Sequence, residues 1–198
     1  MVAPEHKLKL SFTALALGLR ETEVALSVFD RSGDWKAAAS MAVEENAFQL
    51  TSSASTRRVF REVRQRLEVL DPQTREAFVD GSADDRRSIL LIAACKCYSF
   101  IFDFVRTMLA NKVAVFDHNL SQSDFDAYWN QATLEHPELE DISESTRKKI
   151  RQVTFRLLAE AGLLTGTRPP RITVIPISPT VEAVLRREGD IYREAFLS

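Results

Sequence analysis

The sequence has little glycine, cysteine or histidine, and each shortage excludes a class of protein. Only 6 glycines occur in 198 residues, without a glycine-rich phosphate-binding loop or a GxSxG nucleophile motif. The 2 cysteines, Cys95 and Cys97, are too few for a disulfide framework, and we predict that they are reduced core residues. The 3 histidines (His6, His118 and His136) are far apart and lack metal-ligand spacing. We therefore predict a protein that is not an enzyme, with no catalytic residues, no metal and no cofactor.

A long hydrophobic run is also absent. The most apolar tract, residues 89–105, includes Lys96 and Asp103, whereas a membrane span needs about 20 consecutive apolar residues. The N-terminal residues show no signal-peptide hydrophobic region. We expect a cytoplasmic protein with no membrane partner, in which this tract is a buried helix.

The overall charge excludes a protein that binds polyanions with its whole surface. There are 26 Lys and Arg against 28 Asp and Glu, which gives a formal net charge of −2. A hydrophobic content of 45% is enough for a core. A local anion-binding surface remains possible, because the sum does not show where the charges lie.

Helical spacing of apolar residues dominates the chain, so the fold class that we predict is mainly α with a small β element. Two short alternating segments predict strands: an N-terminal strand at residues 7–13 and a C-terminal one at 171–177, where Pro176 favours a sheet edge. We divide the chain into a helical unit at 1–80 and a second unit at 81–198. Helices are expected at 14–30, 35–46 (capped by Asp34), 52–70, 72–80, 84–115, from Ser121 or Ser123 to 136, 143–164 and 179–187.

An internal repeat relates the two units. Residues 34–68 align with residues 124–158 without a gap, and 12 of the 35 positions are identical. The alternative explanation is that any two amphipathic helices resemble each other, without a repeat. Against it, the Ser-Thr-Arg sequence shared by 55–57 and 145–147 is not required by amphipathic spacing. Each unit then consists of helix, turn and helix, as in a helix-turn-helix, although the connections are longer than the usual 3–4 residues.

The second helix of each unit has a basic face opposite its apolar face. Arginine is suited to bidentate contact with phosphate or guanine, so these faces are candidate nucleic-acid-binding surfaces. The alternative is a solvated basic face, or one paired with the acidic segment 124–144, which contains 7 Asp and Glu and no Lys or Arg. The candidates are Arg57, Arg58, Arg61 and Arg64 in the first unit, and Arg147, Lys148, Lys149 and Arg151 in the second.

The strand at 171–177 follows the second basic helix directly. This order is similar to the wing of a winged helix, which would place Arg168 and Arg171 on the phosphate backbone. The alternative is a β-hairpin that closes the fold with the N-terminal strand. The two interpretations are compatible with each other.

Several motifs resemble the BrxA-like small proteins of bacterial BREX (bacteriophage exclusion) loci. They are KLKLSFTALALGL, VEEN with STRR, FDAYWN followed by HPELE, STRKKIRQVTFRLLAEAGLL, and ISPTVEAVL, and together they cover nearly the whole chain. The family has been described as an inner-membrane protein, which this sequence does not support, and has been likened to the NusB-type helical RNA-binding fold. The resemblance implies a small non-enzymatic nucleic-acid-binding component of a phage-defence system that also includes a DNA methyltransferase and ATPases.

The sequence and this resemblance together predict a protein that binds double-stranded DNA in phage defence, with other BREX proteins as further partners. A protein-interaction adaptor and a NusB-like RNA-binding protein are the alternatives. Oligomeric state and base specificity are left open.

Overall fold

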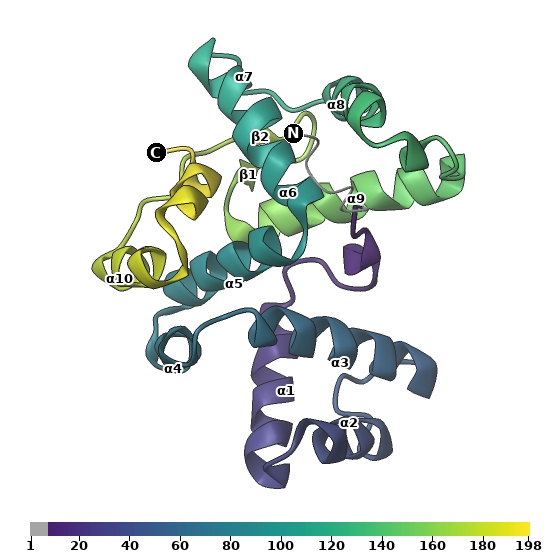
Figure 1. Ribbon diagram of the computed structural model, residues 1–198, viewed down its shortest axis with the longest axis vertical. Helices are drawn as coiled ribbons and strands as arrows, with labels where there is room; N and C mark the ends of the chain where they lie inside the picture. The colour runs from purple at the N-terminus through teal and green to yellow at the C-terminus, as the bar shows by residue number, and fades with distance from the viewer. Residues whose placement is uncertain (1–7) are drawn as a thin grey trace, which may run out of the picture.

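The computed structural model describes residues 8–198, and over them the chain is mainly helical with one two-stranded sheet (Figure 1). The predicted fold class is confirmed. The helices are α1 (Leu19–Ser32), α2 (Trp35–Glu44), α3 (Ser53–Glu68), α4 (Pro72–Asp80), α5 (Ala83–Cys97), α6 (Ser99–Asp103), α7 (Ala110–Ala114), α8 (Gln122–Glu135), α9 (Glu144–Ala161) and α10 (Pro179–Glu188). Ser11–Ala14, Pro137–Leu139 and Asp190–Phe196 are 3-10 segments, Phe104–Leu109 is π-helical, and the strands are β1 (Leu164–Thr165) and β2 (Arg171–Ile172).

Side-chain caps set the start of most of these helices, and the sequence predicts two of them, at Asp34 and at Ser121 or Ser123. The Asp34 carboxylate accepts hydrogen bonds from the first amides of α2, and Ser52 caps α3. Ser121 rather than Ser123 caps α8, in a reciprocal capping box with Asp124. Ser143 caps α9, which ends at Gly162 in the left-handed conformation.

Buried apolar side chains form two clusters. The smaller one joins α1, α2 and α3 through residues such as Val28, Ala38 and Val63. The larger one surrounds α5, whose residues from Ile89 to Cys95 are all buried, and it also takes up Phe12 near the start of the described chain. Figure 1 shows α1, α2 and α3 together at one end of the molecule. The division into units at residue 80 stays a prediction.

The N-terminal strand prediction is wrong for residues 8–13. This segment has no strand partner, and its second half is the 3-10 segment. The Leu8 amide donates instead to the Glu138 carboxylate, and Leu8 and Phe12 are buried in the larger cluster. The alternating pattern therefore identified the core-facing side chains but not the backbone conformation; Lys7 lies outside the described residues.

The single long helix predicted at 84–115 is also wrong, because the chain breaks at Tyr98. The helical segments before and after this residue are bent by 113°. Tyr98 has an extended backbone and a fully buried ring, which packs beside Phe12 and under the Arg66 guanidinium. The tract from Ile89 to Cys95 is buried on every side, so its sequence carries no change of periodicity that marks the break.

The small sheet is formed near the C-terminus. β1 and β2 are antiparallel, with Leu164 opposite Ile172, so the strand predicted at 171–177 is shorter than expected. β2 pairs with β1, which follows α9 directly, and not with the N-terminal segment. The hairpin that was to close the fold through residues 7–13 is therefore absent from the part of the chain that the structure describes.

Candidate nucleic-acid interface

The basic face of α3 is open to solvent along its N-terminal half. Arg57, Arg58 and Arg61, here named the α3 arginine triad, are exposed, and none forms an ion pair or hydrogen bond with another described residue. The fourth candidate, Arg64, donates to Glu68 one turn later at 2.7 Å. The triad is thus a group of three exposed cations on one helix face that have no carboxylate partner among the described residues.

The opposite face of α3 is held firmly in the protein. Val59, Val63 and Leu67 are buried against α1 and α2. Arg66 is 1% exposed and donates to three consecutive backbone carbonyls, those of residues 15–17, at 2.5–2.9 Å. Buried packing and these charged hydrogen bonds fix the rotation of α3, and so fix which arginines face solvent.

Glu62 and Tyr98 complete this buried anchor. The Tyr98 hydroxyl donates to the Glu62 carboxylate and accepts a hydrogen bond from Gln65, both on α3. Burial raises the pKa of Tyr98, so the phenol remains protonated and a donor at neutral pH. This set cannot be predicted from the sequence pattern, because the charge of Glu62 and Arg66 does not reveal that they face the core.

The basic face of α9 is partly occupied by the acidic segment. Arg147 and Arg151 both lie beside Asp126 of α8, with N–O distances of 2.9 and 3.4 Å. The Arg147 guanidinium also stacks on the Trp129 ring of α8. For these two arginines the structure shows the alternative that the sequence left open, pairing within the protein.

The two lysines of α9 are more accessible. Lys148 is exposed and pairs with the exposed Glu144 at 2.6 Å, a contact that competes weakly with an external anion because both groups remain hydrated. Lys149 is exposed and has no ion pair with another described residue. Four predicted α9 residues therefore divide into two that Asp126 holds and two that face solvent.

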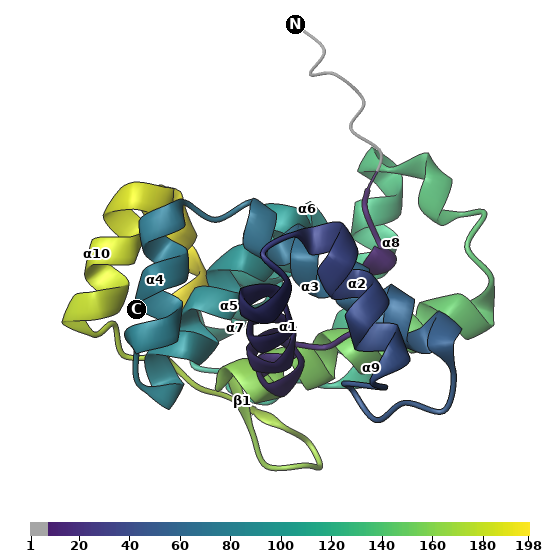
Figure 2. The ribbon, with the colours of Figure 1, turned by 90° about the horizontal axis from the view of Figure 1, so that it is seen from below.

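The β1–β2 hairpin carries the last two candidates. Arg168, in the connecting loop, and Arg171, in β2, are both exposed, and neither forms an ion pair with a described residue. Figure 2 shows this loop extending away from the helices. The Leu120 amide donates to the Pro170 carbonyl and the Ile172 amide donates to the His118 carbonyl, so the hairpin is tied to the segment before α8.

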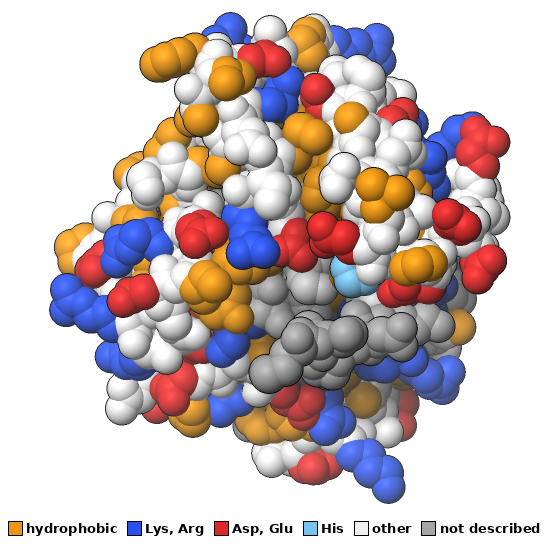
Figure 3. Space-filling view, turned by 45° about the horizontal axis from the view of Figure 1, so that its top comes forward, with side chains coloured by type: hydrophobic (Ala, Val, Ile, Leu, Met, Phe, Trp, Pro, Cys, Tyr) orange, Lys and Arg blue, Asp and Glu red, His pale blue; other side chains and the backbone are white. Residues whose placement is uncertain are grey.

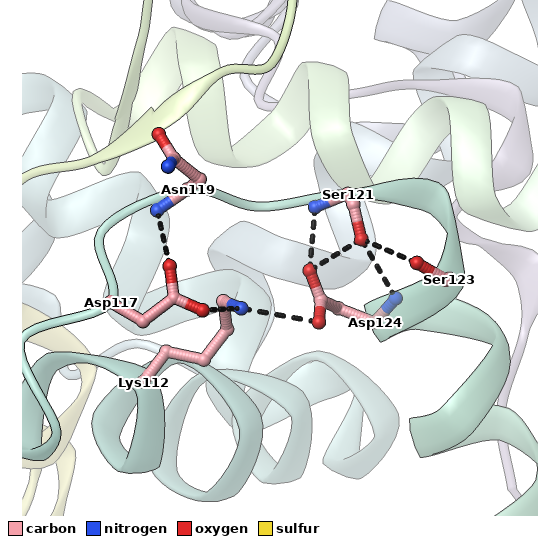
Figure 4. A network of polar contacts seen from close by, with 6 residues as sticks. All are labelled: Lys112, Asp117, Asn119, Ser121, Ser123 and Asp124. Atoms are coloured by element: carbon pink, nitrogen blue, oxygen red, sulfur yellow. Dashed lines mark hydrogen bonds and ion pairs between the residues drawn. The ribbon is translucent and has the colours of Figure 1, made fainter.

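A polar network fixes that segment in turn (Figure 4). Lys112 bridges the carboxylates of Asp117 and Asp124 at 2.6 and 3.1 Å, and Asp124 accepts hydrogen bonds from the amide and hydroxyl of Ser121. Burial alone would lower the pKa of Lys112, but the two carboxylates outweigh it and raise that pKa. The ammonium group therefore stays charged and holds the end of α7 to the start of α8.

α3 and α9 begin at the same side of the molecule and run across it in the same direction (Figure 1). Val59 of α3 and Lys149 of α9 line one hollow between them. On the face seen in Figure 3, by contrast, Lys and Arg side chains are interspersed with Asp and Glu. The two predicted basic helices are thus neighbours, and the arginine triad is the largest group of predicted site cations on one helix that have no ion pair with a described residue.

Comparison with known proteins agrees with this architecture. A family model named BrxA matches residues 6–189 of the chain. The chain belongs to the BrxA family. It is 26% identical over 148 residues to the BREX protein BrxA of Paramagnetospirillum magneticum, which covers 75% of this chain and 74% of that protein. It is 25% identical over 170 residues to the BREX protein BrxA of Escherichia coli, covering 86% of this chain and 80% of the relative.

A solved structure shares the fold of this BrxA-family chain. It is the crystal structure of an uncharacterized protein from Magnetospirillum magneticum, with a TM-score of 0.82 and 22% sequence identity. The match covers 97% of this chain and 100% of that one. The overall fold of this chain is therefore one that a crystal structure also shows.

Neither a metal site nor a membrane span is evident in the part of this BrxA-family chain that the structure describes. No group of three or more His, Cys, Asp or Glu side chains is placed to hold a metal among residues 8–198. No single helix in that range is long and apolar enough to span a membrane, and the one pair of segments that meets both criteria together is the pair bent by 113° at Tyr98. His118 and His136 lie in separate segments, and His6 is outside the described residues.

Proposed function

We propose that this BrxA-family protein is a non-enzymatic, cytoplasmic, DNA-binding component of a BREX phage-defence system. The α3 arginine triad carries the proposal: it is a cluster of exposed guanidinium groups that pair with no carboxylate among residues 8–198, on a helix that the core holds rigidly. The α1–α3 unit then acts as a helix-turn-helix with α3 as its recognition helix. The relatives named BREX protein BrxA support the defence role.

Lys148 and Lys149 of α9 and Arg168 and Arg171 of the hairpin provide a second set of phosphate contacts. They lie on the neighbouring helix and on the loop that projects from it (Figure 2). An interface of this kind is dominated by phosphate contacts, so its affinity falls steeply as salt rises. We assign no base-reading residue.

A protein-interaction adaptor is the second candidate, and Leu134 of α8 favours it. This leucine is 76% exposed on the helix that carries much of the acidic segment. An exposed large apolar side chain within an acidic surface suits a basic amphipathic partner, such as another BREX protein. RNA binding in the manner of NusB is the third possibility, and the choice of nucleic acid in the binding test separates it from duplex DNA binding.

The test is a salt-titrated binding assay of the purified protein with duplex DNA, single-stranded DNA and duplex RNA of equal length. Reversing two triad charges, in Arg57→Glu with Arg61→Glu, is expected to weaken duplex DNA binding by about ten-fold or more at 0.1 M salt. Arg186→Glu with Arg187→Glu in α10 is the matched control, since it reverses two exposed arginines elsewhere on the surface. Lys148→Glu with Lys149→Glu tests the second set.

Equal binding by the triad variant and the α10 control would show that the proposed contact surface is wrong. Tighter binding of RNA than of duplex DNA by the unaltered protein would favour the NusB-like alternative. If none of the three nucleic acids bound at 0.05 M salt, the adaptor function would be left as the better proposal.

A further inference from the structure

A hollow beside the hairpin, here named the hairpin groove, has the composition of a nucleotide-binding site. Its walls are α9, the start of α8 and the β1–β2 loop. Phe155, Leu120, Leu164 and Pro170 give it an apolar lining. The volume is about 650 Å³, within the range of small-molecule sites.

The charge lining the hairpin groove is all of one sign. Lys148, Arg151 and Arg168 line it, and none of its lining residues is Asp or Glu. Lys148 and Arg151 have carboxylate partners outside this lining, Glu144 and Asp126, and Arg168 has no ion pair with a described residue. Three other hollows on the described surface each include carboxylates, among them Glu160, which lines two of them, and Glu144. An apolar floor with a cationic rim is complementary to a ligand that has a flat apolar part and an anionic part.

The walls of the groove are fixed relative to one another. A backbone hydrogen bond from the Leu120 amide to the Pro170 carbonyl joins the hairpin to the start of α8. The Lys112–Asp117–Asp124 network in Figure 4 holds that start in place. Phe155 is half-buried and packs edge-on against Phe125 of α8, with 6.2 Å between ring centroids. The aromatic surface is therefore preorganised, which limits the entropy lost when a ligand binds.

Two amide side chains add polar groups that suit a base edge. Gln152 of α9 and Gln122 of α8 both line the groove, and no hydrogen bond to another described side chain engages either amide. A carboxamide offers both a donor and an acceptor, so it matches the mixed edge of any base. Stacking on an aromatic ring is likewise tolerant of base identity.

From these features we infer that the hairpin groove holds one unpaired nucleotide of the nucleic acid that the protein binds. The base lies against Phe155, and the flanking phosphates lie at Lys148 and Arg168. This inference rests on the proposed function, because the arginine triad and the hairpin must bring nucleic acid to the groove. A base stacked inside a perfect duplex cannot enter without first leaving the stack, so an unpaired base is the favoured ligand.

The test compares three DNA duplexes that differ at one central position: a perfect duplex, one with a single extra nucleotide, and one with an extra abasic sugar-phosphate. Binding is measured by fluorescence anisotropy at fixed salt. The extra nucleotide is expected to tighten binding by about ten-fold, whereas the abasic insertion is expected to give less than about two-fold, since it bends the duplex but offers no base to stack.

Phe155→Leu removes the ring and keeps an apolar side chain. We expect it to reduce the preference for the extra nucleotide to less than about two-fold and to leave the affinity for the perfect duplex unchanged. Phe116→Leu is the matched control, because Phe116 is 87% exposed on the connection after α7 and does not line the groove. Gln152→Glu is a second variant that does not disturb the core: it puts a carboxylate into the groove at an exposed position and is expected to lower the same preference.

The outcomes distinguish this inference from the proposed function. Equal affinity for the perfect and bulged duplexes, with binding that depends on the arginine triad, would overturn the groove inference and leave DNA binding intact. A preference for the bulge that neither Phe155→Leu nor Gln152→Glu reduces would also overturn it. Failure to bind any of the duplexes would overturn both proposals.

Discussion

Replacing Arg66 with methionine is predicted to be one of the most damaging single substitutions in the chain. The guanidinium is 1% exposed and donates to the carbonyls of Leu15, Ala16 and Leu17. It also lies 5.3 Å from the centroid of the Tyr98 ring. Methionine keeps an unbranched apolar stem but ends about where the Arg66 Nε lies, so the substitution removes the guanidinium and its hydrogen-bond donors.

The magnitude follows from the three carbonyls. A buried acceptor that loses its donor costs about 1–3 kcal/mol, and a hydrogen bond from a charged donor contributes about 1.5–3 kcal/mol. The three losses are not additive, and removal of a buried charge recovers part of its desolvation cost, so we expect a decrease of about 3–5 kcal/mol in the free energy of unfolding. That is a large share of the 5–15 kcal/mol that stabilises a typical domain.

Urea unfolding followed by circular dichroism measures this decrease. With a denaturant slope of about 2–3 kcal/mol per molar, the midpoint is expected to fall by about 1–2.5 M. Arg64→Met is the matched control on the same helix, since Arg64 is exposed and its pair with Glu68 contributes about 0.5 kcal/mol or less. Arg66→Lys keeps the charge but not the planar fork, and should lie between the two. If the midpoints of Arg66→Met and Arg64→Met agreed within about 0.3 M, the anchoring role of Arg66 would be refuted.

Three further predictions concern charge. Changing all three residues of the arginine triad to alanine should make the slope of log K for duplex DNA against log salt less negative by about 2.7. The factor by which affinity falls between 0.05 and 0.2 M salt then becomes smaller by about 40-fold. Duplex binding measured over that range checks this, and an unchanged slope would contradict it. Asp126→Asn frees the two α9 arginines that it pairs with, so duplex affinity should rise several-fold, as a binding titration would show. Burial would raise the pKa of Asp124, but hydrogen bonds from Ser121 and Lys112 hold it below 3.8. Stability from this carboxylate is therefore present above about pH 5 and lost as the pH falls through the folded-state pKa, and urea titrations at pH 3–7 should show that Asp124→Asn removes that part of the acid sensitivity.

Much of the helical layout could be predicted from local signals. Asp34, Ser121 and Ser143 cap the helices that their positions predict, and α4 spans the predicted residues 72–80. These features depend on backbone amides within one turn, so neighbouring residues are enough to determine them. Tyr98 marks the limit, because the break there is stabilised by contacts with Phe12 and with α3, which are distant in sequence.

For the candidate interface, the sequence predicts only which side chains helical spacing places on the exposed face. Spacing places the triad on the face opposite Val63, and the structure agrees. It does not distinguish Arg66 from Arg156, which occupy equivalent positions of the repeat. Arg66 is buried on three carbonyls, whereas the Arg156 side chain is 73% exposed and pairs with Glu160. Tertiary packing decides between these outcomes, and the alignment of the two units contains no trace of it.

The two basic helices differ most in what surrounds them. A phosphate that approaches Arg147 or Arg151 must compete with Asp126, which already lies within 3.4 Å of both. A phosphate that approaches the arginine triad displaces only water, because no described carboxylate pairs with it. The long-range attraction between a polyanion and a basic surface is also stronger where the protein's own carboxylates are farther away. First contact with a polyanion is therefore favoured at α3. The net charge of −2 thus conceals an asymmetry: the acidic segment neutralises part of one basic helix and leaves the other open.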